Sequence, residues 1–196
     1  MGAGGSVNSF DYITVLVAIM IGLAIADIAS SLHRLLRAGK KVRWDWIAPT
    51  AAALVLLELF NLWWKWHGFT GSTLGEVMPY FGVLLLLYLA ASASLPDEVP
   101  VEGIDLKTFA AQSHLYFWSV YTAFVVTWIG LRTALDIGRG DTAATIVTNH
   151  WFDYLSIAVY GLVIALRRRW LSGLALAGTL IWLGWGWWSM RLAGVS

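Results

Sequence analysis

The feature that most constrains this chain is a succession of apolar runs of about 20 residues, the length that a helix needs to cross the hydrocarbon core of a bilayer. Hydrophobic residues make up 59% of the 196 residues and charged residues only 13%. A soluble domain carries about 25% charge, and its core has no room for so many apolar runs. The sequence therefore predicts an all-α integral membrane protein.

Six crossings are expected, over residues 12–36, 46–66, 75–94, 109–135, 151–166 and 170–190. The fifth is short and reaches full length only with its flanking residues. The expected architecture is a single domain over residues 1–196, a bundle of six transmembrane helices.

Basic residues indicate the orientation of this bundle. The first expected loop holds Arg34, Arg37, Lys40, Lys41 and Arg43, and the fifth holds Arg167, Arg168 and Arg169. Six crossings place both loops on one side of the membrane, and short basic loops face the cytoplasm. Both termini are therefore expected outside. The net charge of +1 argues against a nucleic-acid partner, and the absence of cysteine excludes disulfides, thiolate metal sites and thiol nucleophiles.

The second crossing carries a carboxylate into the membrane. Glu58, Asn61 and Lys65 are spaced i, i+3 and i+7, so they share one helix face. An acid at this depth costs about 2.5–3.5 kcal/mol on insertion scales, which is why such residues often serve transport. Asp27 on the first crossing lies nearer the cytoplasm. Two interpretations stay open: a polar path for protons or small ions through Asp27 and Glu58, or structural hydrogen bonds at Glu58 with Asp27 paired locally near the interface.

Tryptophan is unusually frequent, with 13 residues, and most map to the outer half of the membrane. The residues of interest on the second and last crossings are Trp63, Trp64, Trp66, Trp182, Trp185, Trp187 and Trp188. They form either an aromatic cluster that ties these two helices together or a surface that binds lipid, pigment or a partner protein.

The first crossing carries small residues at i+4 spacing, a pattern that lets another helix approach closely. They are Ala18, Gly22, Ala26 and Ser30. The approaching helix belongs either to this chain or to a second copy.

Residues 10–67 and 152–191 show a faint parallel repeat. Phe10-Asp11-Tyr12 opens the first segment and Phe152-Asp153-Tyr154 opens the second, and each continues with a span, a basic cluster, a second span and a Trp pair. One interpretation is duplication. The other is that acids at helix starts and aromatics at interfaces recur for physical reasons.

Several short motifs carry a resemblance. They are Phe10-Asp11-Tyr12-Ile13-Thr14, Gly22, Trp44, Phe60-Asn61-Leu62-Trp63-Trp64, Met78-Pro79-Tyr80 and Leu95-Pro96-Asp97. Across residues 10–97 the chain resembles a widespread group of small bacterial polytopic membrane proteins with no assigned activity. The resemblance implies a multi-pass protein of the bacterial inner membrane and no functional residues.

The function predicted is a small channel or transporter for protons or a small ion that uses the buried carboxylate Glu58. The alternative is a non-catalytic accessory or scaffold subunit whose Trp-rich outer half binds lipid, pigment or a partner. The chain lacks P-loop, dinucleotide and nucleophile-elbow motifs, so an enzyme is not expected; an intramembrane enzyme using Asp27, His33, Arg34 and His114 is the third option. No cofactor or metal is evident, a bound lipid fits, and the expected partners are membrane lipids with a homo-oligomer or a larger membrane complex.

Overall fold

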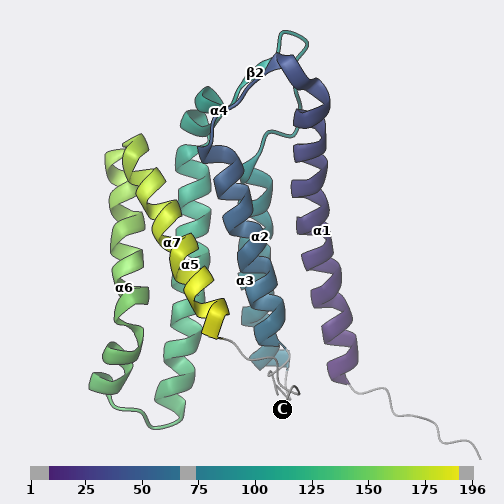
Figure 1. Cartoon of the computed structure of the whole chain (residues 1–196). Coiled ribbons are helices and arrows are strands. Elements are labelled where there is room, and N and C mark those ends of the chain that lie inside the picture. The colour runs from purple at the N-terminus through teal and green to yellow at the C-terminus, as the bar shows by residue number, and fades with distance from the viewer. Residues whose placement is uncertain (1–8, 67–73, 190–196) are drawn as a thin grey trace, which may run out of the picture.

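The computed structural model describes residues 9–66 and 74–189, with side chains for residues 13–65 and 75–187. In chain order the elements are α1 (Ser9–Ala38), η1 (Gly39–Lys41), β1 (Val42–Arg43), α2 (Ile47–Trp66), α3 (Leu74–Ser94), β2 (Ile104–Asp105), α4 (Leu106–Gln112), α5 (His114–Gly138), α6 (Ala143–Leu166) and α7 (Arg169–Ser189) (Figure 1).

Four of these helices, α1, α2, α3 and α5, are long and apolar enough to cross a membrane. The prediction of an all-helical membrane protein is confirmed at this level. The expected first, second, third and sixth crossings agree with α1, α2, α3 and α7 to within a few residues. Helices α6 and α7 have 24 and 21 residues and run alongside the others.

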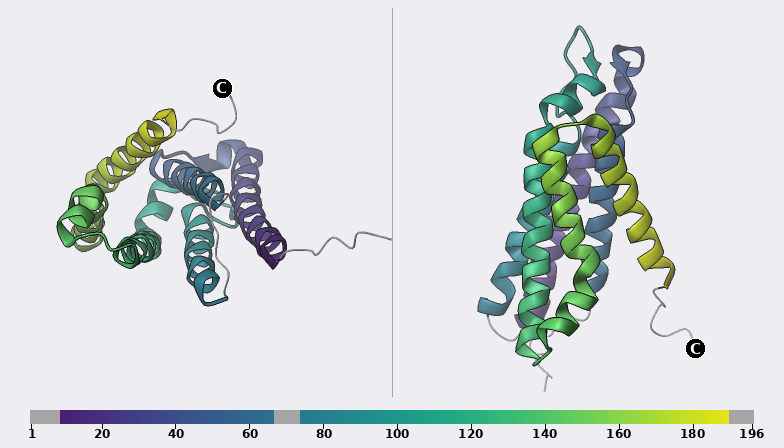
Figure 2. Two further views of the ribbon diagram at one scale, coloured as in Figure 1. Left: turned by 90° about the horizontal axis from the view of Figure 1, so that it is seen from below. Right: turned by 90° about the vertical axis from the view of Figure 1, so that its left-hand side faces the viewer.

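Five helices form a closed ring, and α1 lies outside it. Contacts run from α2 to α3, then to α5, α6 and α7, and from α7 back to α2. Helix α1 packs on the α2–α3 side of this ring (Figure 2). The interior of the ring is therefore built from α2, α3, α5, α6 and α7.

The long helices alternate in direction. The segments 34–43 and 167–169 lie at the upper end in Figure 1, which we call the basic end; the other is the distal end. Helices α1 and α6 both run toward the basic end and α2 and α7 away from it, as a parallel repeat requires. Duplication itself stays a prediction.

The basic end carries a small folded cap. Strands β1 and β2 pair in parallel, with Val42 opposite Ile104 and Arg43 opposite Asp105. Gly103 has a φ of +99° and lies directly against the carbonyl of Lys41, an approach that a side chain would obstruct. The segment 95–105 between α3 and α4 is partly folded, because Leu95 is buried and Ile104 pairs with β1. The cap holds α4 over the end of the ring.

Two expected boundaries are wrong. The fourth crossing was expected over residues 109–135, but the helix is interrupted at Ser113, between the end of α4 and the start of α5. The Ser113 hydroxyl donates to the carbonyl of Phe109 (2.9 Å), a local bond that competes with helix continuation. The fifth crossing was expected from residue 151, but Thr142 caps α6 by accepting from the backbone N–H of Thr145, so the helix begins at Ala143.

Candidate functional site

Glu58 lies on the face of α2 that is turned into the ring. Its Oε2 accepts a hydrogen bond from Nδ2 of Asn61 (3.3 Å), and its Oε1 accepts one from the hydroxyl of Tyr121 on α5 (3.3 Å). The expected shared face of Glu58 and Asn61 is therefore realised as a direct contact. Both carboxylate oxygens have a partner, which offsets part of the cost of removing this group from water.

Lys65 lies one turn beyond Asn61 but does not pair with Glu58 in the described structure. Its Nζ lies 5.4 Å from the centre of the Trp128 ring, a cation–π contact. Lys65 therefore lies toward the distal end and takes no part in the hydrogen bonds of Glu58.

A central cavity of about 110 Å³ surrounds Glu58, with walls from α2, α5, α6 and α7. Its polar lining residues are Glu58, Asn61, Lys65, Tyr121, Arg132, Asp153, Ser156, Tyr160 and Thr179. Across the cavity, the hydroxyl groups of Tyr160 and Thr179 are 2.6 Å apart. This space is polar and large enough for several water molecules.

A second cavity, the vestibule, adjoins the first toward the distal end. It measures about 290 Å³ and lies between α2, α3 and α5. Lys65, Trp128 and Arg132 line both cavities. The vestibule also contains Asp136 and Arg139. The two cavities thus meet at a pair of cationic side chains.

A charged network joins α5 to α6 beside the vestibule, around the nearly buried His150 (3% exposed). Its Nε2 lies 2.7 Å from Oδ2 of Asp136, and its Nδ1 lies 3.1 Å from Oδ2 of Asp153. Arg132 binds Asp153 (3.2 Å), and Arg139 binds Asp136 (3.5 Å). The network therefore joins one imidazole, two carboxylates and two guanidinium groups across the α5–α6 junction.

Sequence reasoning missed this network. The i, i+3 spacing of His150 and Asp153 was visible, but their partners Arg132 and Asp136 lie on another helix. In the described residues no group of three or more His, Asp or Glu side chains is arranged to hold a metal ion.

A layer of buried rings closes the central cavity toward the basic end. We call Phe117, Trp118, Tyr121 and Tyr160 the aromatic layer. The Tyr121 ring centre is 5.9 Å from that of Phe117 and 5.5 Å from that of Tyr160, and Trp118 is also 5.5 Å from Tyr160. Tyr121 and Tyr160 face the central cavity, while Phe117 and Trp118 line a third cavity at the basic end.

Asp27 lies on α1, outside the ring, and lines none of these three cavities. Its charged neighbours are Asp97, just after α3, and Arg34. The Arg34 guanidinium donates to the hydroxyl of Ser31 (2.9 Å). The structure therefore does not bring Asp27 to Glu58, and local pairing of Asp27 near the interface stays a prediction.

The small residues of α1 face away from the bundle. Ala18, Gly22, Ala26 and Ser30 are all exposed, and a Cβ at Gly22 would meet nothing within 4 Å. Helix α1 packs through its other face, which carries Val17, Ala24, Ile28 and Leu35. Packing of this groove against another described helix of the same chain is therefore wrong, and contact with a second copy stays a prediction.

The tryptophans divide between packing and surface. Trp63 packs against the core, and Trp182 stacks on Phe152 of α6 with ring centres 3.9 Å apart but is also exposed. Trp64, Trp185 and Trp187 are exposed as well, Trp185 most of all at 76%. The side chains of Trp66 and Trp188 lie outside the described residues.

Comparison of the chain with protein-family models, with curated proteins and with solved structures found no match. The function must therefore be inferred from the three cavities and the side chains that line them.

Proposed function

We propose that this protein conducts protons across the bacterial inner membrane through six spans, with both termini outside and Glu58 as the central proton-binding group. The observation that carries the proposal is the position of Glu58: a carboxylate inside the helix ring, in a polar cavity that adjoins a vestibule.

The outward faces of α6 and α7 support six spans. Leu155, Leu162 and Leu166 are exposed on α6, and Leu174 and Ile181 are exposed on α7. In water this surface would be unfavourable, whereas lipid tails cover it. The polar residues of α6 that lower its hydropathy, His150 and Asp153, face the charged network instead. Six spans place the basic end in the cytoplasm.

The charges of the vestibule favour protons over metal cations. Any cation entering from the distal end passes Lys65 and Arg132 before it reaches Glu58. Arg132 is paired with Asp153, but the vestibule lining still carries three cationic side chains, Lys65, Arg132 and Arg139, against the one carboxylate of Asp136. This excess of positive charge repels metal ions, whereas protons move along water and hydroxyl chains. Beyond Glu58, the next hydroxyl groups are those of Tyr121 and Tyr160, within the aromatic layer. In the proposed orientation, the vestibule would give access to Glu58 from outside, and the aromatic layer would close the path toward the cytoplasm.

The test is proton flux into liposomes that hold a pH-sensitive dye, with the membrane potential clamped. Glu58→Gln preserves the shape of the side chain, and the Asn61 amide can turn to match it, so the fold is retained. We expect this variant to lose at least about tenfold in flux, while Glu102→Gln, at an exposed loop carboxylate, retains it. Equal flux for wild type and Glu58→Gln would overturn the proposal.

A scaffold or accessory subunit is the alternative function, favoured by the outward small-residue groove of α1 and by exposed Trp185. It predicts no proton flux above that of empty liposomes. It also predicts a partner or lipid retained on detergent extraction, which native mass spectrometry detects.

A further inference from the structure

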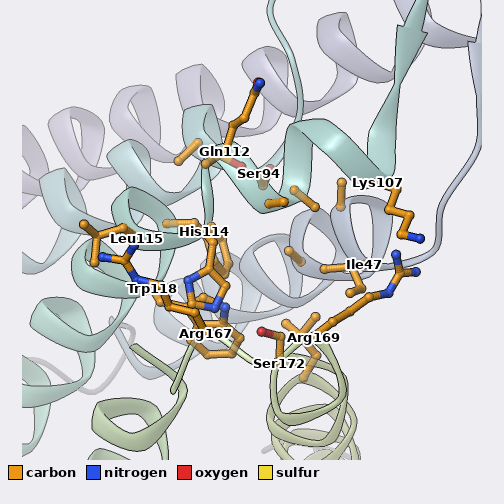
Figure 3. A pocket seen from close by; sticks show the side chains of 18 residues that line it. Ile47, Ser94, Lys107, Gln112, His114, Leu115, Trp118, Arg167, Arg169 and Ser172 are labelled. Atoms are coloured by element: carbon orange, nitrogen blue, oxygen red, sulfur yellow. The ribbon is translucent and has the colours of Figure 1, made fainter. Parts of the chain in front are cut away.

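The third cavity lies at the basic end, apart from the vestibule and the central cavity that lead to Glu58. It measures about 480 Å³ and lies between the first turns of α2, α5 and α7, the last residues of α3, and α4 (Figure 3). This volume falls within the range of about 300–1,000 Å³ typical of small-molecule sites.

Two polar side chains in this cavity lack partners. The two ring nitrogens of His114 are buried, and neither has a hydrogen-bond partner. The hydroxyl oxygen of Ser172 is also buried without a partner, and the residue is 2% exposed. Figure 3 shows both side chains on the same cavity, with Arg167 beside them. Because buried polar groups in proteins are almost always paired, these atoms indicate that the cavity binds a polar ligand.

The charges of the lining identify the sign of that occupant. Lys107, Arg167 and Arg169 line the cavity, and no acidic residue does so. Arg169 is paired with Asp45, but Lys107 and Arg167 have no ion pair in the described part of the chain. The positive ends of α2, α5 and α7 add to the same potential, and the negative C-terminal end of α3 offsets part of it. An anion is the ligand that this lining favours.

Apart from Ser94, Gln112 and Ser113, the remaining lining is apolar. Ala48 and Ala51 of α2, Leu176 of α7, and the rings of Phe117 and Trp118 form the side nearest the aromatic layer. A hydrated inorganic ion gains nothing from such a surface, whereas an organic body does.

We propose that the basic-end cavity binds an organic anion. Its carboxylate or phosphate group lies at Arg167, His114 and Ser172, and its apolar body lies against Phe117 and Trp118. Two sources share this chemistry, a soluble organic acid and a single-chain anionic lipid. The proposal does not depend on proton conduction through Glu58.

The experiment measures equilibrium binding of radiolabelled 1-naphthoate to the full chain in phosphatidylcholine nanodiscs, with empty nanodiscs as the blank. We expect saturable binding, and at least tenfold weaker competition from the uncharged isostere 1-naphthamide. Arg167→Gln weakens binding about tenfold, and Arg167→Lys restores part of it. The matched control is Arg168→Gln, which removes the neighbouring charge outside the cavity lining and leaves binding unchanged.

Competition then separates the two sources. Displacement by low micromolar lysophosphatidic acid indicates a lipid, and resistance to it indicates a soluble acid; both support an anion site. The proposal is overturned by the absence of saturable binding, by equal competition from naphthamide, or by equal losses in Arg167→Gln and Arg168→Gln.

Discussion

The hydroxyl of Tyr121 donates a hydrogen bond to Oε1 of Glu58 across 63 residues of sequence, with 3.3 Å between the two oxygens. This bond ties the second span to α5 and leaves the carboxylate with no unpaired oxygen, since Asn61 binds the other.

Removal of that hydroxyl tests how far the carboxylate depends on it. We expect Tyr121→Phe to destabilise the fold by about 1–3 kcal/mol, because a buried acceptor loses its donor. Proton flux falls as well, since the hydroxyl nearest to Glu58 on the basic side is lost. Thermal unfolding and the liposome assay measure the two effects. Tyr116→Phe removes an exposed hydroxyl from the same helix and serves as the control; equal losses in both variants would contradict the role of Tyr121.

His150 stabilises the α5–α6 junction through two carboxylates. His150→Gln is expected to cost about 1–3 kcal/mol, a partial loss because Arg132 and Arg139 remain on the two acids. Thermal unfolding measures this loss. His33→Gln, at an exposed position on α1, is the control and leaves the melting temperature unchanged. Equal losses in both variants would contradict this role of His150.

The outward groove of α1 predicts self-association. Gly22→Leu adds bulk where nothing lies within 4 Å, so the protomer fold is unaffected. If a second copy packs there, the variant shifts toward monomer in native mass spectrometry. Leu16→Phe adds bulk at another exposed position on the same helix and leaves the oligomer intact. An unchanged distribution for Gly22→Leu would remove this groove as an interface.

Gly103 fixes the cap at the basic end. Gly103→Ala is expected to cost about 1–3 kcal/mol, because it combines a positive φ with a clash against the carbonyl of Lys41. Gly140→Ala provides the comparison, with a φ of +86° and open space around it, and costs only the backbone strain. Hydrogen exchange of residues 95–105 reports the loss of the cap directly.

Residue spacing and apolar runs predicted the features that lie within one helix. The pairing of Glu58 with Asn61 follows from i, i+3 geometry, and apolar runs located α1, α2 and α3. The break at Ser113 was missed because neither Gly nor Pro marks it. We attribute the interruption to the hydrogen bond of the Ser113 hydroxyl. A serine within a helix usually causes no interruption, so the residue type gave no warning.

Contacts between helices could not be predicted from the sequence. Nothing in the order of residues places α1 outside the ring, and without that knowledge Asp27 was joined to Glu58. The pairs Tyr121–Glu58 and His150–Asp136 depend on which helices become neighbours. In the sequence, His114 belonged only to the small set of residues considered for an intramembrane enzyme. The cavity that it lines forms only where α2, α4, α5 and α7 converge.

All four rings of the aromatic layer belong to α5 and α6, and the charged network clamps these two helices to each other. If the protein conducts protons as proposed, the barrier on the cytoplasmic side is therefore carried by a single helical hairpin. A displacement of that hairpin against α2 and α7 would then open the inner end of the path without a second moving element.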